Sequence, residues 1–160
     1  MSDNWIALIP QNVDSAVTDD QLNEAASLFQ DIAPEAEEIT VINQSKLRLF
    51  DCGGNLERIV CPHCAGDIEL EWWRDQVEAG YEEGDDDSEN DGESFNLVEL
   101  ELPCCHKHSD LSMLSYSWDQ GFSRWGIDVM NPDIGELTAE QASKFESVLG
   151  CPIKVIYQHI

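Results

Sequence analysis

The stretch Cys61-Pro62-His63-Cys64 and its distant counterpart Cys104-Cys105 decide how this chain of 160 residues is held together. Two cysteines separated by two residues can bind one metal ion, because the short loop between them lets both thiolates face it. Zinc takes four such ligands in a tetrahedron, and a second cysteine pair supplies the other two. The spacing therefore predicts a zinc site with four ligands: Cys61, Cys64, Cys104 and Cys105.

The second half of this predicted site is less regular than the first. Cys104 and Cys105 are adjacent, and adjacent residues rarely point at one ion without a local bend in the backbone. The run that follows offers histidine nitrogens as substitutes, first His108 and then His106. Two further interpretations of the cysteines stay open: reduced thiols without an ion, and a redox pair, which typically sits at a helix N-terminus that lowers the thiol pKa.

A zinc ion held by four thiolates has no position open for water, so we expect this zinc to be structural and not catalytic. The chain has six cysteines in all. Cys52 lies in a Gly-Gly turn near the first pair, and we interpret it as a bystander or as a thiol beside the site. Cys151 follows a helix stop and is expected to be a small buried side chain.

Five stretches of the chain form a recognisable set: DCGGNLERIVCPHC (51–64), WW (72–73), LPCC (102–105), YSWDQGFSRW (116–125) and LGCPIKVIYQHI (149–160). Together they resemble a family of uncharacterised small bacterial proteins with a CPxC…PCC pattern. In that family the second pair usually reads Pro-Cys-Cys-Gly, without histidines. The resemblance therefore implies Cys104 and Cys105 as ligands over His108, although His106 stands here where the family has glycine. It implies no particular function.

The charge of the chain is strongly negative, with 33 acidic and 8 basic residues and a formal net charge of −25. Residues 82–93 hold 8 of the acidic residues and no basic one, yet 25 acidic residues remain elsewhere. The acidity is therefore spread over the whole surface. Such a surface repels nucleic acids and anionic lipids and attracts basic proteins. We expect a basic protein partner, no nucleic acid and no membrane.

Composition predicts a globular protein, because 42% of the residues are hydrophobic and five are tryptophans. No apolar run approaches the roughly 20 residues that cross a bilayer. Residues 1–5 do not show the basic and then apolar pattern of a signal peptide. We therefore expect a cytoplasmic protein with reduced or metal-bound cysteines. The length fits one domain over residues 1–160, with residues 82–93 as a mobile acidic insertion.

Hydrophobic periodicity and capping residues predict the secondary structure. Helices are expected to begin at Thr18, Asp67 and Thr138, and the second is expected to fade at Gly80. Strands are expected at 5–9, 38–42, 47–50, 95–102, 122–130 and 153–157. Most strands are expected to be joined by hairpins. The prediction is an α+β domain with a mixed or antiparallel sheet, about three helices and a zinc-ribbon-like metal site.

The sequence contains no Gly-x-Ser-x-Gly, no phosphate-binding glycine loop and no His-Glu-x-x-His. Our leading hypothesis is a non-enzymatic, zinc-stapled acidic binding protein, in its most concrete form an immunity or antitoxin-type protein that neutralises a basic toxin. A plain stability domain of a larger complex is a further possibility. The main alternative is an enzyme with a structural zinc and a pocket formed near four residues: Asp110, Tyr116, Trp118 and Arg124.

Overall fold

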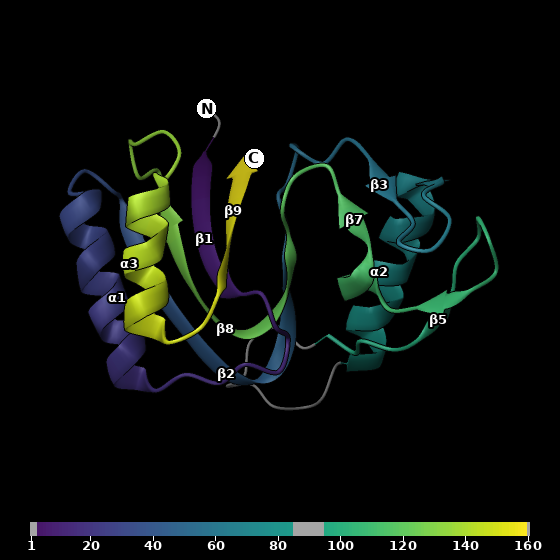
Figure 1. The fold of residues 1–160 in the computed structure, drawn as a ribbon, viewed down its shortest axis with the longest axis horizontal. Coiled ribbons are helices and arrows are strands. Elements are labelled where there is room, and N and C mark those ends of the chain that lie inside the picture. The colour runs from purple at the N-terminus through teal and green to yellow at the C-terminus, as the bar shows by residue number, and fades with distance from the viewer. Residues whose placement is uncertain (1–2, 85–94, 160) are drawn as a thin grey trace.

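A four-stranded sheet forms the centre of the protein. Figure 1 shows a computed structural model of the chain, which describes residues 3–84 and 95–159. Every neighbouring pair of strands in the central sheet is antiparallel. In their order across the sheet the strands are β2 (Glu38–Phe50), β8 (Gly121–Met130), β1 (Asn4–Pro10) and β9 (Ile153–His159). Together with the helices, this sheet confirms the predicted α+β class.

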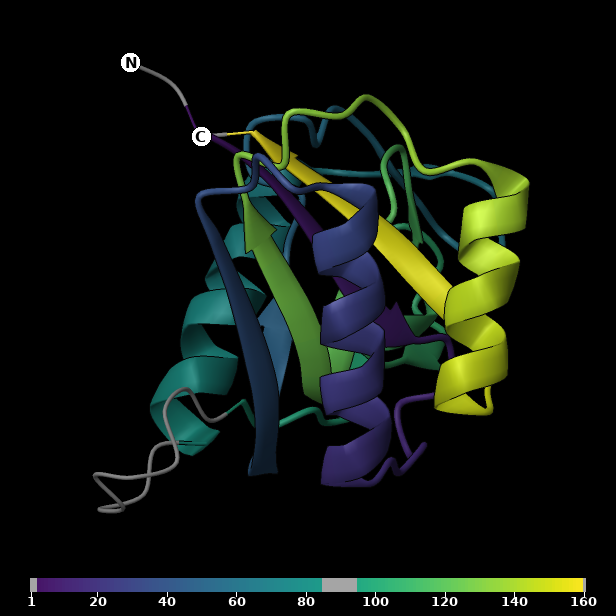
Figure 2. The same cartoon turned by 90° about the vertical axis from the view of Figure 1, so that its left-hand side faces the viewer.

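Two helices cover one face of the sheet (Figure 2): α1 (Asp19–Ile32) and α3 (Ala139–Leu149). Each helix connects two strands that have a third strand between them, so the expectation of mostly hairpin connections is wrong for this sheet. The chain order β1-α1-β2 followed by β8-α3-β9, with β1 and β8 in the centre, is the split β-α-β arrangement of ferredoxin-like folds.

Both helices begin where the sequence predicts. Thr18 and Thr138 are N-caps, and each forms a capping box with the glutamine three residues later, Gln21 and Gln141. At the other end of α3, Gly150 has a φ of 73°, the left-handed conformation that ends a helix most easily with glycine. These local signals determine where the two helices begin and where α3 ends.

The main core lies between the two helices and the sheet. Phe29 of α1 and Phe145 of α3 meet with ring centroids 5.3 Å apart, and both side chains are fully buried. They pack with Trp125 and Ile127 of β8 and with residues of β1 and β9. At about 25 cal/mol per Å² of buried apolar surface, such aromatic side chains dominate the stability of the core.

Residues 51–120 are inserted between β2 and β8, and the described parts of this insertion, 51–84 and 95–120, stand beside the sheet (Figure 1). Their elements are β3 (Ile59–Val60), β4 (Asp67–Ile68), α2 (Leu70–Gly84), β5 (Leu100–Glu101), β6 (His108–Ser109), the 3-10 helix η1 (Leu111–Met113) and β7 (Ser115–Tyr116). Strands β4, β3 and β7 form one small sheet, and β5 and β6 form a hairpin. A second core, which includes Ile59, Trp73, Phe95 and Leu102, joins the insertion to Leu49 and Phe122 of the large sheet.

Several predicted boundaries are wrong. The segments 38–42 and 47–50 belong to one strand, β2, which carries a bulge between Asn43 and Arg48. The alternating segment 95–102 pairs only at Leu100–Glu101. At the start of this segment the N–H groups of Phe95 and Asn96 donate to the carbonyls of Leu47 and Gly80, so the backbone there is bound to β2 and α2 and does not extend the pairing with β6.

Helix α2 also differs from its prediction. Asp67 lies in β4 and pairs with Val60, so it does not cap the helix, and α2 continues past Gly80 to Gly84. The first residues of the predicted acidic insertion 82–93 thus belong to this helix. The rest of that insertion falls in 85–94, outside the described residues. Among the described helices, none has the length and hydrophobicity to cross a membrane.

Candidate metal centre

The four predicted cysteines come together at the far end of the insertion. The Sγ atoms of Cys61, Cys64, Cys104 and Cys105 all lie within 4.8 Å of one another, and those of Cys61 and Cys105 are 3.7 Å apart. Four sulfurs about 2.3 Å from a central ion form a tetrahedron with edges of about 3.8 Å. The cluster therefore has the dimensions needed to hold one metal ion.

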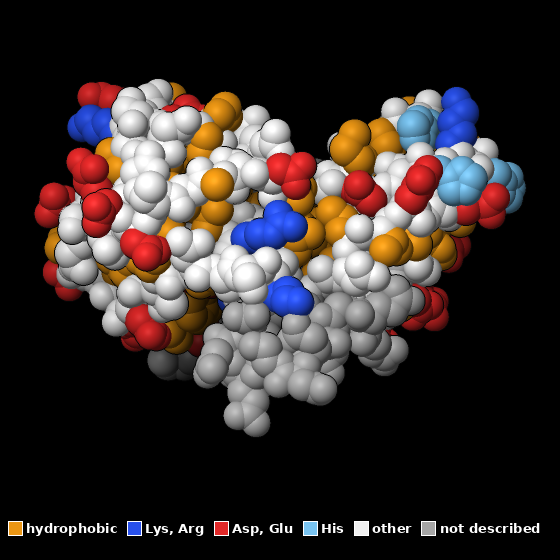
Figure 3. Space-filling model, turned by 90° about the horizontal axis from the view of Figure 1, so that it is seen from below, with side chains coloured by type: hydrophobic (Ala, Val, Ile, Leu, Met, Phe, Trp, Pro, Cys, Tyr) orange, Lys and Arg blue, Asp and Glu red, His pale blue; other side chains and the backbone are white. Residues whose placement is uncertain are grey.

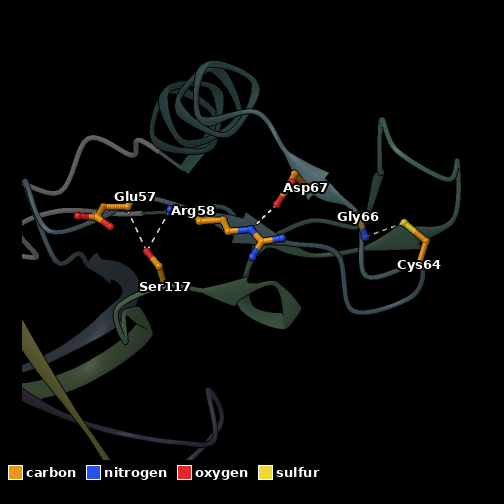
Figure 4. Close-up of polar contacts among 6 residues, drawn as sticks. All are labelled: Glu57, Arg58, Cys64, Gly66, Asp67 and Ser117. Atoms are coloured by element: carbon orange, nitrogen blue, oxygen red, sulfur yellow. Dashed lines mark hydrogen bonds and ion pairs between the residues drawn. The ribbon is translucent and has the colours of Figure 1, made fainter.

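The first pair lies in a tight turn between β3 and β4, the first knuckle (61–66). The Cys61 N–H donates to the Gly66 carbonyl at 2.9 Å, and the Ala65 N–H donates to the Cys61 carbonyl at 3.1 Å. Ala65 adopts a φ of 60° to close this turn. The bend turns two backbone N–H groups toward sulfur: His63 N–H to Cys61 Sγ at 3.3 Å, and Gly66 N–H to Cys64 Sγ at 3.4 Å (Figure 4).

The second pair lies in a turn of the same backbone shape between β5 and β6, the second knuckle (102–107). The Leu102 N–H donates to the Lys107 carbonyl at 2.8 Å, and the His106 N–H donates to the Leu102 carbonyl at 2.9 Å. His106 has a φ of 61°, which matches Ala65 in the first knuckle. When the two knuckles are aligned by these hydrogen bonds, Cys105 takes the position of Cys64. This is the local bend that two adjacent cysteines need to face one ion.

The other two positions do not correspond in the same way. Leu102 stands where the first knuckle has Cys61, and Cys104 stands where it has His63. The second knuckle therefore supplies its ligands from its third and fourth residues, and its first residue belongs to the second core, where Leu102 is 1% exposed.

His106 and His108, the possible histidine ligands, do not belong to the cluster that the described residues form. His106 faces Glu101, with Nδ1 4.0 Å from the carboxylate, and its side chain is largely exposed. The backbone carbonyl of His108 lies 3.2 Å from His63 Nε2. The geometry thus favours the two cysteines over His106 and His108 as the second pair of ligands.

The four thiols differ in exposure and acidity. Cys61 is buried and Cys105 half-buried, whereas Cys64 and Cys104 are exposed. Burial acts to raise the pKa of Cys61, but hydrogen bonds from the backbone of Cys64 and His63 and from the Cys104 thiol lower it to about 6. The pKa of Cys104 is raised to about 12, first by desolvation and then by its hydrogen bonds to Cys64 and Cys61. The lowered pKa of Cys61 therefore favours its thiolate, the form that binds metal.

Contacts outside the cysteines hold the first knuckle in place (Figure 4). The Ser117 hydroxyl accepts hydrogen bonds from the N–H groups of Glu57 and Arg58, both at 3.0 Å. The Arg58 side chain then donates to the Asp67 carboxylate across β3 and β4. Because this pair is exposed, its main effect is to position the strands, with little net stabilisation.

The remaining cysteines do not belong to the cluster. Cys52 is fully buried beneath the large sheet, and its thiol donates to Gln120 Oε1 at 3.2 Å, so the interpretation of Cys52 as a thiol beside the site is wrong. Burial, reinforced by Asp51, raises the pKa of Cys52 to about 11. Cys151 is half-buried and lines a surface cleft. The first knuckle precedes β4 and not a helix, so the setting typical of a redox pair does not occur here.

The pocket expected for the enzyme alternative is only partly formed. Asp110 and Arg124 line one cleft. Tyr116 lies apart from it, where its hydroxyl accepts from Trp73 Nε1 at 3.1 Å and donates to the Leu111 carbonyl, and burial raises its pKa above the usual range. Trp118 is 40% exposed and does not line the cleft. The four residues therefore do not converge on one site. The cleft is lined instead by Cys151, which the sequence suggested only as a buried side chain, and by the loop 11–15, to which the sequence assigned no role.

Comparisons of the chain with protein-family models, with curated proteins and with solved structures gave no match. The resemblance to the bacterial CPxC…PCC family therefore stays a prediction.

Proposed function

We propose that this protein is a non-enzymatic binding module, in which a structural zinc ion pins the insertion and an acidic surface receives a basic protein partner. The observation that carries the first half is the cysteine cluster, whose four sulfurs lie within 4.8 Å of one another. Four thiolates suit zinc, Cu(I) or iron, and a closed tetrahedral set formed by two knuckles is the usual form of a structural zinc site.

The zinc would serve the fold and not a reaction. A closed set of four thiolates gives no coordination position to water or substrate. What such an ion supplies is a link between two turns that are far apart in the sequence, with helix α2 between them. In this chain the two knuckles come from the β3–β4 and β5–β6 turns, and Gly66 of the first approaches the Cys104 side chain of the second.

The acidity of the folded surface supports the second half. Residues 85–94 hold six of the 33 acidic residues and none of the eight basic ones, so 27 acidic residues remain elsewhere. No acidic side chain whose burial the structure describes is buried. Three of the basic side chains are already matched with aspartates: Arg48, Arg58 and Arg124. A basic partner would therefore meet an excess of uncompensated carboxylates, which favours fast, salt-sensitive association.

The most concrete form of the proposal is an immunity or antitoxin-type protein, whose acidic face would cover the basic, nucleic-acid-binding surface of a toxin. Its test is affinity for a basic protein probe, such as cytochrome c, measured by calorimetry between about 20 and 300 mM salt, where the Debye length falls about fourfold. Affinity should fall steeply with salt. An affinity that stays flat over this range would contradict the electrostatic half of the proposal and leave the zinc half standing.

A further inference from the structure

A cleft beside Arg124 is lined by residues from both the sheet side and the insertion. Its volume is about 830 Å³, in the range of small-molecule sites. One wall is the loop 11–15 that follows β1, with Cys151 and Pro152 beside it, and the facing wall comes from the insertion and includes Leu97, Asp110 and Met113. Figure 3 looks onto the side of the molecule along which the loop runs, and Lys or Arg side chains lie near the middle of this face among hydrophobic ones.

The sheet itself opens the cleft. Strand β1 pairs with β8 from Trp5 opposite Met130 to Leu8 opposite Ile127, and the pairing stops there. On the other side, the bulge of β2 interrupts the pairing between Trp125 and Ser123. Arg124 lies between these two residues and is the position of β8 that has no paired residue in either β1 or β2. Bulges of this kind commonly re-aim a side chain beside a binding site.

The guanidinium of Arg124 is available to a ligand. Its Nη1 lies 3.9 Å from Asp14 Oδ1, at the outer limit of an ion pair, and the Asp14 side chain is 90% exposed. Such a pair contributes little and is easily replaced. Among the residues that the structure describes, no other Lys or Arg lines the cleft. Arginine presents several N–H donors in one plane, which suits a carboxylate held by two hydrogen bonds.

The other residues that line the cleft restrict which carboxylate-containing ligands it can bind. Leu47, Leu97 and Met113 give the cleft an apolar side, and Met113 is 61% exposed. Asp14 and Asp110 are the two acidic residues of the lining. Because the whole protein is strongly negative, a ligand with net negative charge is repelled at long range. A ligand that carries an ammonium group as well as a carboxylate avoids this repulsion.

We propose that the Arg124 cleft binds a small zwitterion with an apolar body, that is, an amino acid or short peptide. Arg124 holds the carboxylate, Asp14 at the rim attracts the ammonium group, and the apolar side chains lie against Leu47, Leu97 and Met113. None of the four cysteines of the metal centre lines the cleft, and the ligand is not the basic protein partner, so binding to the metal-loaded protein tests this proposal separately from the proposed function.

The experiment titrates the full chain with leucyl-leucine, with its N-acetyl derivative and with its C-terminal amide, by calorimetry. Leucyl-leucine should bind at one saturable site, and each derivative should bind more weakly. Arg124→Met keeps the apolar stem and should weaken binding about tenfold to a hundredfold, the usual range for losing a charged hydrogen bond. Asp14→Asn should have a smaller effect in the same direction. The matched control is Arg74→Met, an exposed arginine of α2 outside the cleft.

Cys151 reports where the ligand lies. It lines the cleft and is half-buried, whereas Cys52 is fully buried and serves as an internal reference. Saturating leucyl-leucine should slow the alkylation of Cys151 by iodoacetamide, as followed by peptide mass spectrometry, and Arg124→Met should abolish this protection. The proposal is overturned if no saturable binding occurs, or if Arg124→Met and Arg74→Met bind equally. Equal binding of the N-acetyl derivative would overturn the ammonium contact, and equal binding of the amide would overturn the carboxylate contact.

Discussion

Leu102 occupies, in the second knuckle, the backbone position that Cys61 occupies in the first. Each of these residues donates its N–H to the carbonyl five positions later and accepts at its own carbonyl from the N–H four positions later. Cys61 places a sulfur in the cluster, while Leu102 contributes to the second core. The metal centre is thus built from two copies of one turn, and in the second copy the first ligand has moved to Cys104.

The equivalence of Leu102 and Cys61 predicts that a cysteine at position 102 can restore metal binding after Cys104 is removed. Cys104→Ser should lose the metal, because serine is a poor replacement for a thiolate. The double variant Leu102→Cys/Cys104→Ser should bind one metal per chain again, since a thiol at position 102 repeats the Cys61 and Cys64 arrangement. Elemental analysis of both purified variants measures this. Retention of the metal in Cys104→Ser alone would show that Cys104 is not a ligand.

The metal should support the fold of the insertion. Structural zinc in small peptides is worth on the order of 10–16 kcal/mol apparent, which exceeds the stability of a typical domain. Cys61→Ser should therefore lose the metal and the near-UV circular dichroism of the insertion, with a lower melting temperature. Cys151→Ser, outside the cluster, should change neither. A metal-free Cys61→Ser protein with an unchanged melting temperature would contradict this prediction.

Gly80 should be sensitive to a single added methyl group. A Cβ at this position would lie less than 3.0 Å from three ring atoms of Phe95. That ring is held by Tyr81 and Phe122, with centroids 5.0 and 4.7 Å away, so it cannot easily give way. Gly80→Ala should cost about 1–3 kcal/mol of unfolding free energy in urea, despite the better helix propensity of alanine. Gly135→Ala is the control, because nothing lies within 4 Å of its Cβ. Equal stability of the two variants would argue against the tight contact.

Stability should fall at alkaline pH through Cys52. Its pKa is raised from 9.0 to about 11 in the folded protein, so the thiol stays protonated in the fold after it would have ionised in the unfolded chain. The contribution is fully present below pH 9 and is lost as the pH rises toward 11. Urea unfolding over this range should show a steeper decline for the natural protein than for Cys52→Ala. Parallel declines would indicate that Cys52 does not ionise differently in the two states.

The sequence predicts best those features that local chemistry determines. Thr18 with Gln21, and Thr138 with Gln141, place two helix starts because a capping box is complete within four residues. The cysteine cluster was predictable for a similar reason. Two sulfurs separated by two residues constrain each other, and a chain with only one other close cysteine pair leaves little choice of partner.

Features that depend on tertiary contacts were missed. Phe95 alternates as a strand residue should, yet its N–H donates to the Leu47 carbonyl of β2, and β5 is limited to Leu100–Glu101. The pairing of β1 with β8 depends on which strands meet across the crossover helices, which alternation does not encode. The cleft was missed because it arises where β1 and β8 part beside the β2 bulge, and because the loop 11–15 and Arg124, which line it together, are far apart in the sequence.

The most direct test of the metal centre is the metal content of the purified protein by elemental analysis, with thiol titration on the same sample before and after denaturation. We predict one zinc per chain, with the thiols of Cys61, Cys64, Cys104 and Cys105 protected until the protein unfolds. Only Cys151 should then react in the native state, because Cys52 is fully buried. A protein without metal, in which the exposed Cys64 and Cys104 react as freely in the native state as after unfolding, would contradict the metal centre.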